Sequence, residues 1–143
     1  MSSAISDFRL AYAAGYFDGE GCIWVFNNNK SLSLRASIVS GDTETLQVFV
    51  DLFGGKISPV KCKSSKISIF RWSRNEKEAF DFLEKICPFM VCKRYQAQLV
   101  LSSGWQFRTY LGGRGHFLPV EERLKRSALQ ASLREAKRLG EIK

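Results

Sequence analysis

The chain has 143 residues, 45% of them hydrophobic, which is enough for one domain with a real core. It carries 22 Lys and Arg against 14 Asp and Glu, and the net charge of +8 favours a polyanion such as nucleic acid as partner. Four cysteines without a C-x-x-C pair, and a single histidine, argue against zinc sites and histidine-based nuclease chemistry. We expect reduced, mostly buried thiols and a metal, if any, held by oxygen ligands.

No apolar run has transmembrane length, and the N-terminus has no basic stretch followed by an apolar segment. We therefore expect an intracellular protein without a membrane partner, present where DNA is, in a bacterial cytoplasm or an organelle. The chain is predicted to be a single domain over 1–143, with a core of about 6–111 and a C-terminal helical extension of about 117–140.

The first predicted helix follows Ser6 and Asp7, both good N-caps, and continues to about Phe17. One face carries small residues at helical spacing, so that a second helix could approach closely: Ala11, Gly15, Asp18 and Gly19. Another face is suited to covering a sheet, with Leu10, Ala14 and Phe17.

The end of this helix is unusual because Glu20 lies between Gly19 and Gly21. Its carboxylate adds negative charge where a helix already accumulates about half a negative charge, and a cation would relieve this conflict. If two such helices pack side by side, two carboxylates meet and form a site for oxygen-preferring ions such as Mg²⁺. The alternative interpretation is an ordinary glycine-rich helix end with an exposed glutamate.

A β-hairpin is predicted next, with a strand over 22–26, a turn over 27–31 and an alternating strand over 32–38. The apolar face of the second strand is Leu32, Leu34, Ala36 and Ile38, and its solvent face is Ser33, Arg35 and Ser37. Asp42 is the expected N-cap of a helix that ends at Gly54-Gly55 and has an apolar stripe of Leu46, Phe49, Val50 and Phe53.

The same pattern then recurs, with strands over 56–63 and 66–73 that turn at Ser64-Ser65. Asn75 is the expected N-cap of a helix that ends at Cys87-Pro88, with a stripe of Ala79, Phe80, Phe82, Leu83 and Ile86. The remaining elements are a helix from about Val91 to Tyr110, a flexible loop over 112–116 and a charged amphipathic helix from Pro119 to Leu139.

This order predicts an α+β fold, αββαββα, with an extra C-terminal helix. Four antiparallel strands with helices on one face leave the other face free. Two copies of such a unit would form a concave, positively charged, saddle-shaped sheet that can place two-stranded ribbons in a major groove.

The segment Ala14–Gly21, with the sequence AGYFDGEG, resembles the LAGLIDADG motif of homing endonucleases, and this family also has the predicted element order. The resemblance implies that Glu20 and the Gly19 carbonyl bind a catalytic divalent cation, Mg²⁺ or another such as Mn²⁺. It further implies a homodimer whose interface helix contributes Ala11, Ala14, Gly15, Asp18 and Gly19. For Asp18 a structural role at the helix end is favoured.

Two further segments carry matching catalytic positions. Lys93, followed by Gln96 and Ala97, resembles the lysine-bearing helix start of the family, which implies that its cation polarises water or stabilises the phosphate. Gln96 would support it. Ser40 occupies the position where a glutamine can order the active-site water, and Asp42 competes with it for this role although it is expected to be an N-cap.

The free face of the sheet is expected to bind double-stranded DNA, with arginine reading guanine and lysines near the turns holding phosphates. The candidate residues are Trp24, Phe26, Asn28, Lys30, Ser33, Arg35, Ser37, Ser58, Lys61, Lys63, Lys66, Arg71 and Ser73. Large aromatic side chains are more often core than contact residues, so the faces of Trp24 and Phe26 could be reversed.

The resemblance implies an intron-encoded, metal-dependent homing endonuclease that hydrolyses both strands of a long, partly palindromic site and leaves short 3′ overhangs. One alternative is an inactive or bifunctional intron maturase, with intron RNA as partner, or a DNA-binding regulator. Another is a protein-interaction module without nucleic acid. The presence of Glu20 and Lys93 favours the enzyme, because a pure binder has no electrostatic reason to keep them.

Overall fold

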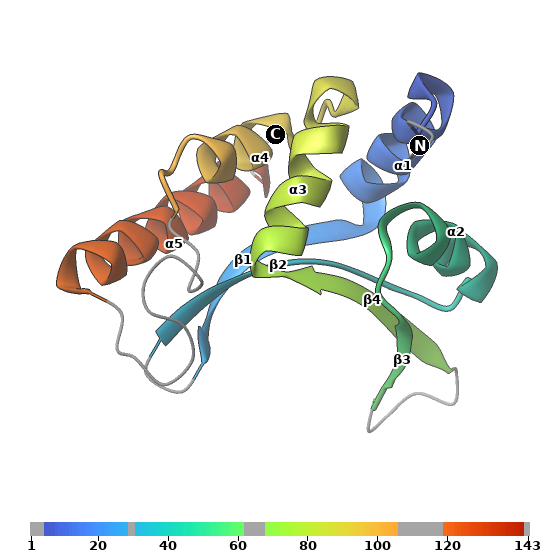
Figure 1. Cartoon of the computed structure of the whole chain (residues 1–143), viewed down its shortest axis with the longest axis horizontal. Coiled ribbons are helices and arrows are strands. Elements are labelled where there is room, and N and C mark those ends of the chain that lie inside the picture. Colours follow the sequence, from blue (N-terminus) through green and yellow to red (C-terminus); the bar gives the residue numbers. More distant parts are fainter. Residues whose placement is uncertain (1–4, 29–30, 62–67, 106–118, 142–143) are drawn as a thin grey trace.

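The computed structural model describes residues 5–28, 31–61, 68–105 and 119–141 (Figure 1). Its elements are α1 (Asp7–Glu20), β1 (Gly21–Asn28), β2 (Ser31–Ser40), α2 (Thr43–Phe53), β3 (Ile57–Val60), β4 (Ile69–Asn75), α3 (Glu76–Ile86), η1 (Cys87–Phe89), α4 (Arg94–Leu101) and α5 (Val120–Glu141). This order confirms the predicted αββαββα pattern with an additional C-terminal helix.

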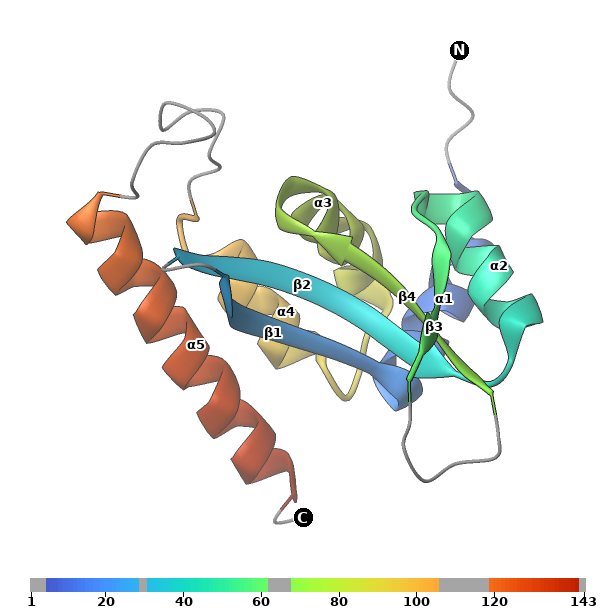
Figure 2. The same cartoon turned by 90° about the horizontal axis from the view of Figure 1, so that it is seen from below.

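The four strands form one antiparallel sheet in the order β1-β2-β4-β3. Helices α1 to α4 cover one face, and none of the described helices lies on the curved opposite face (Figures 1 and 2). Because side chains alternate along each strand, the register assigns every residue to the covered face or to the open face, which we call the outer face. The outer face is therefore the side of the sheet that the described helices leave open.

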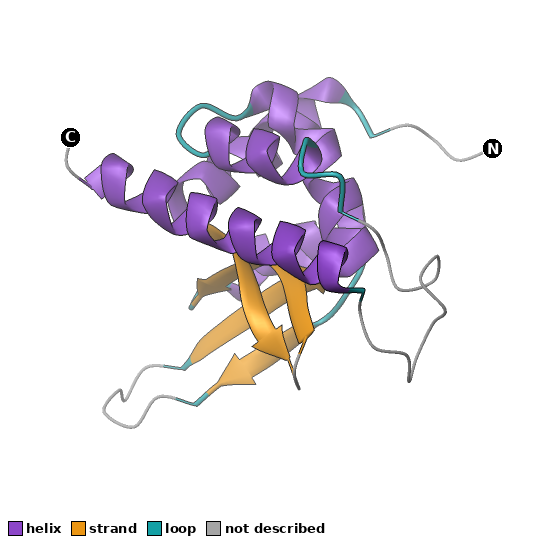
Figure 3. Ribbon diagram, turned by 90° about the vertical axis from the view of Figure 1, so that its left-hand side faces the viewer, coloured by secondary structure: helices purple, strands orange, loops and turns teal. Residues whose placement is uncertain are grey.

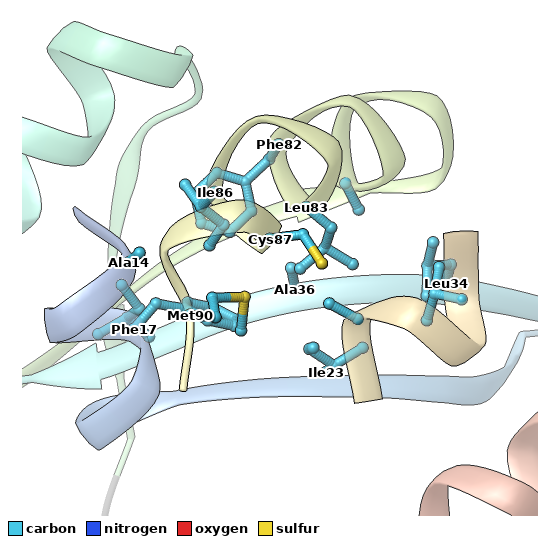
Figure 4. Packing of buried hydrophobic residues seen from close by; sticks show 14 of the residues in the cluster. Ala14, Phe17, Ile23, Leu34, Ala36, Phe82, Leu83, Ile86, Cys87 and Met90 are labelled. Carbon is cyan, nitrogen blue, oxygen red and sulfur yellow. The ribbon is translucent and has the colours of Figure 1, made fainter. Parts of the chain in front are cut away.

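The core lies between the sheet and its helices (Figure 4). Phe17 of α1 and Phe82 of α3 meet edge to face at 5.2 Å, above Ile23 and Ala36 of the sheet. A Cβ at Gly21 would come within 2.3 Å of the Phe17 ring. Only glycine therefore lets the chain pass directly from α1 into β1 while Phe17 stays in the core.

Two predicted caps are confirmed. The Ser6 hydroxyl accepts a hydrogen bond from the Arg9 backbone N–H at 3.3 Å. The Asp42 carboxylate accepts from both the Thr45 hydroxyl, at 2.7 Å, and the Thr45 N–H, at 3.1 Å. The hydroxyl bond is the main reason that the pKa of Asp42 lies below its usual value. The predicted end of this helix is also correct, since Gly54 follows α2 with a φ of +83°.

The prediction of a helix from Val91 to Tyr110 is wrong, because α4 covers only Arg94–Leu101. Residues 91–93 form a turn whose Val91 and Lys93 N–H groups donate to the Asp18 carboxylate. At the other end, the Ser102 hydroxyl bonds the Gln98 carbonyl at 2.7 Å, and Gly104 has a φ of +73° that ends the helical path. Residues 106–118, with the predicted loop at 112–116, lie outside the described residues.

The strands of the first hairpin extend further than predicted. The turn was expected over 27–31, but β1 continues to Asn28 and β2 begins at Ser31. The predicted turn at Ser64-Ser65 lies outside the described residues. Asn75 occupies the N-cap position of α3 but makes no side-chain cap hydrogen bond. Its Oδ1 instead accepts from Arg35 Nε at 2.9 Å, so the predicted capping role is wrong.

Helix α5 lies along the outer edge of β1 and against α4 (Figures 2 and 3). Gln130 and Lys137, two helical turns apart, donate to the carbonyls of Val25 (2.7 Å) and Ile23 (2.5 Å). These carbonyls belong to an edge strand and point away from β2, so α5 takes the place of a further strand. No helix among the described residues is long and apolar enough to cross a membrane.

The anchor of α5 is the buried Arg126 side chain. It donates to the Leu32 carbonyl at 2.7 Å and to the Glu122 carboxylate at 3.1 Å. Its guanidinium also stacks on the Trp105 ring at 4.0 Å. A buried charge with these partners is costly to leave unpaired, so the position of α5 depends on this residue.

We expect Arg126→Ala to lower the free energy of unfolding by about 3 kcal/mol, because it leaves the Glu122 carboxylate buried without its closest cation. Urea denaturation followed by circular dichroism measures the change. Arg123→Ala, an exposed arginine on the same helix, is the control and should change stability by less than about 0.5 kcal/mol. Equal effects of the two substitutions would contradict this role of Arg126.

Candidate functional site

The C-terminal end of α1 brings together the sequence-predicted residues Asp18, Gly19, Glu20 and Lys93. The Asp18 carboxylate accepts the N–H groups of Val91 at 2.6 Å and Lys93 at 2.9 Å. The Lys93 ammonium donates in turn to the backbone carbonyl of Asp18. Asp18 therefore holds the start of α4 against α1, and the Lys93 cation relieves part of the negative charge at the helix end.

Glu20 and Gly19 are exposed at the point where α1 enters the sheet. Within the described ranges, no hydrogen bond or ion pair engages the Glu20 carboxylate. Its oxygens and the terminal carbonyls of α1 are the donors that hard divalent cations prefer, so they fit such an ion in kind. In the described part of the chain, no three His, Cys, Asp or Glu side chains gather as a metal site. A hard cation at Glu20 would therefore need further ligands from outside these side chains.

Ser40 lies at the end of β2, where its hydroxyl is already engaged. Its Oγ accepts from the Tyr16 hydroxyl at 3.1 Å and from the Asp42 N–H at 3.0 Å. Both acceptor positions of the hydroxyl are therefore used, and only its own proton remains to be donated. Ser40 ties β2 to α1 and to the cap of α2, and its role in ordering water stays a prediction.

Gln96 lies on α4, one turn after Lys93. Its Oε1 is buried and has no hydrogen-bond partner among the described residues. A buried carbonyl oxygen without a donor is rare in folded proteins and indicates a group that a partner or ordered water completes. This is consistent with a supporting polar role beside Lys93, which stays a prediction.

The open question about β1 is settled by burial. Ile23 and Val25 are buried in the core, which places Trp24 and Phe26 on the outer face. The strand register places most of the predicted DNA-binding residues on the same face: Ser33, Arg35, Ser37, Ser58, Arg71 and Ser73. Lys61 is exposed just after β3. Lys30, Lys63, Lys66 and the side chain of Asn28 lie outside the described residues.

The prediction that Ser33 and Ser37 face solvent is wrong. They lie on the outer face, yet they are only 9% and 5% exposed. Ser33 is paired with Phe26, and Ser37 lies between Cys22 and Ser73, so neighbouring side chains cover both small hydroxyls. The groups that the outer face presents are mainly larger side chains such as Trp24, Arg35 and Arg71.

Asn75 is an outer-face residue that sequence reasoning missed. It is paired with Arg35 across β2 and β4, and the two side chains share a hydrogen bond. The alternation of Arg71 and Ser73 continues to Asn75 and could have revealed it, but its position before a helix favoured the capping interpretation.

The outer face is electropositive. Burial lowers the pKa of Arg35 from its ordinary value, and the charge of nearby Arg71 lowers it further. No Asp or Glu occupies an outer-face position among the described strand residues. The two guanidinium groups therefore repel each other without a carboxylate to offset them, which favours an anionic or acceptor-rich partner.

A second exposed surface follows one side of α1. Ala11, Gly15 and Gly19 are exposed, and a Cβ at either glycine would meet nothing within 4 Å. Phe8 (86% exposed) and Tyr12 (49% exposed) continue this side at helical spacing. Exposed large apolar side chains beside open glycines are typical of a surface that another protein covers.

The prediction for Ala14 is corrected by the same burial pattern. Ala14 is fully buried in the core of its own chain and is not available to an interface. Asp18 is half-buried and engaged with the start of α4. The exposed stripe of α1 is therefore Phe8, Ala11, Tyr12, Gly15 and Gly19.

No family model and no curated protein matches this chain. Among solved structures, it is similar to the archaeal intron-encoded homing endonuclease I-Vdi141I, complexed with DNA, with a TM-score of 0.68 and 19% identity over 91% of this chain and 84% of the other. For the LAGLIDADG meganuclease I-AabMI, bound to uncleaved DNA, the TM-score is 0.59 with 23% identity over 87% and 44%. For the homing endonuclease I-CvuI, in complex with its target in the presence of Ca, the TM-score is 0.55 with 21% identity over 67% and 65%.

The present chain thus spans less than half of I-AabMI and just under two thirds of I-CvuI. The chain has the fold of the LAGLIDADG homing endonucleases.

Proposed function

We propose that this protein is a LAGLIDADG-type, metal-dependent DNA endonuclease that acts as a homodimer and hydrolyses both strands of a long, partly palindromic duplex site. The observation that carries the proposal is the exposed Glu20 at the end of α1, whose carboxylate has no partner among the described residues. The Lys93 ammonium lies close to it, bound to the backbone carbonyl of Asp18. The products would have short 3′ overhangs, as the resemblance to the family implies.

The dimer is supported by the incomplete site and by the exposed stripe of α1. A two-fold axis beside Gly15 and Gly19 would bring two α1 helices together where side chains leave space. It would also bring two Glu20 carboxylates to one place, and each chain would then supply half of the cation ligands. Phe8 and Tyr12, exposed in one chain, would become buried near the other end of the pair.

At this centre, Glu20 and the Gly19 carbonyl would hold a divalent cation such as Mg²⁺ or Mn²⁺. Such an ion lowers the pKa of an attacking water and neutralises charge on the leaving oxygen. The Lys93 ammonium, released from or shared with the Asp18 carbonyl, would stabilise negative charge on the phosphate. Gln96 would help to position the Lys93 ammonium, and the hydroxyl proton of Ser40 would orient the attacking water.

DNA would lie along the outer face of the two sheets. Arg35 and Arg71 supply positive charge at its centre, and Lys61 supplies charge at its rim. Trp24 and Phe26 add apolar surface that can contact thymine methyl groups.

We expect Glu20→Gln to lower the cleavage rate at least about 100-fold, because the variant loses the charged cation ligand but keeps the side-chain volume. A duplex recovered by selection from a random pool serves as substrate, with Mg²⁺, and gel electrophoresis measures cleavage. DNA affinity should remain within about twofold of the unchanged protein. Glu121→Gln, an exposed glutamate on α5, is the matched control and should cleave normally. Full activity in Glu20→Gln would refute the metal role.

We expect Gly15→Leu to prevent dimer formation while the chain still folds. A Cβ at this position meets nothing within 4 Å in the single chain, and leucine favours helix over glycine by up to about 1 kcal/mol. Sedimentation velocity should show a monomer, and circular dichroism should show unchanged helix content. Ala128→Leu, which places the same side chain on the exposed side of α5, should leave the dimer intact. A dimer of Gly15→Leu as stable as the unchanged one would place the interface elsewhere.

A further inference from the structure

Arg35 is held from both sides on the central strand of the outer face. On the β1 side, its guanidinium carbon lies 4.4 Å from the centre of the Phe26 ring and 5.9 Å from that of the Trp24 ring. On the β4 side, its Nε donates to Asn75 Oδ1 at 2.9 Å. These contacts restrict both the orientation of the Arg35 guanidinium plane and the direction of the side chain.

The terminal nitrogens of Arg35 remain without a partner among the described residues. The Nε atom donates to Asn75, and the Phe26 ring packs against the guanidinium from the β1 side. Arg71 repels the same charge, and no outer-face carboxylate in the described strands accepts from it. The two Nη atoms are thus a fixed pair of parallel donors that the protein itself leaves unsatisfied.

We propose that Arg35 reads a guanine in the major groove through its two Nη atoms, and that Asn75 is its positioning residue. This inference rests on the proposed binding of DNA by the outer face. Guanine presents two neighbouring acceptors, O6 and N7, to the major groove, and an arginine that meets both distinguishes it from the other bases. Because Phe26 and Asn75 already restrict the Arg35 side chain, less conformational entropy is lost when this contact forms.

A phosphate is a less suitable target for this arrangement. Its oxygens accept hydrogen bonds from many directions, so holding the guanidinium plane fixed would bring little advantage. Arg35 also lies on a central strand of the sheet, between β1 and β4, and not at the rim where backbone contacts are expected. Direct reading of adenine by Asn75 would need its Oδ1 to accept from the base a second hydrogen bond, besides the one it already accepts from Arg35.

The test is a selection of binding sequences from a pool of random DNA duplexes, carried out with the full chain and with four variants. The variants are Arg35→Met, Asn75→Ala, Asn75→Asp and the control Asn27→Ala, and methionine is chosen because it has no N–H donor for guanine. Asn27 is the matched control because it is an exposed asparagine in the same sheet with its side chain on the opposite face. Thermal unfolding of each variant shows whether the fold is kept.

We expect the unchanged protein to select guanine at one position of each half-site with a preference of at least about fivefold. Arg35→Met and Asn75→Ala should lose this preference while the other positions of the motif stay. Asn75→Asp should keep it, because its carboxylate still accepts from Nε, although its charge weakens overall affinity. Asn27→Ala should select the same motif as the unchanged protein.

Three results would overturn the inference, and they separate it from the proposed function. If the unchanged protein selects a motif that Arg35→Met leaves intact, the reading of guanine by Arg35 is wrong while DNA binding stands. If Asn75→Ala keeps the guanine, or Asn75→Asp loses it, Asn75 does not act by accepting from Arg35. If the unchanged protein binds no duplex, the proposed function fails and this inference fails with it.

Discussion

The hydrogen bonds of Asp18 determine the geometry of the whole candidate centre. One carboxylate accepts from two backbone N–H groups that are 73 and 75 residues away in the chain, and so fixes the turn before α4 against the end of α1. Because that turn contains Lys93, its ammonium reaches the Asp18 carbonyl. Gly21 then permits β1 to start at once, since any side chain there would collide with Phe17. Glu20 lies between Asp18 and Gly21, whose positions are fixed in this way, and its side chain is exposed.

The rest of the fold decides which surfaces stay free for partners. Helices α1 to α4 cover one side of the sheet, and α5 lies along the β1 edge (Figure 3). Its Gln130 and Lys137 side chains donate to the carbonyls of that edge. Closing this edge leaves the outer face and the exposed stripe of α1 as the main uncovered surfaces in the described part of the chain. One surface is cationic and the other is apolar with open glycines, and they meet near Glu20. This proximity is what makes a shared centre between two copies physically reasonable.

Local patterns were sufficient for much of the fold. The alternation around Ile23 and Val25 correctly placed β1, and the cap at Asp42 and the glycines after Phe53 correctly placed α2. These features depend on side chains that act within one or two turns of their own position. The motif Ala14–Gly21 likewise indicated the helix and the fold to which it belongs.

The remaining features depend on partners that are distant in sequence. The start of α4 was misplaced because Asp18, on another helix, satisfies the N–H groups of residues 91 and 93. Asn75 has two competing roles, and only the pairing of β2 with β4 decides between them. Ser33 and Ser37 are covered because of the size of their cross-strand neighbours, and the burial of Ala14 depends on how α1 rotates over the sheet.

The account depends most on two chains sharing one centre at the ends of their α1 helices. The most direct measurement is the mass of the complex between the purified protein and a selected duplex, obtained by sedimentation equilibrium over a range of protein concentrations. The account predicts two chains per duplex throughout the range in which the DNA is saturated. A complex of one chain with one duplex would contradict it.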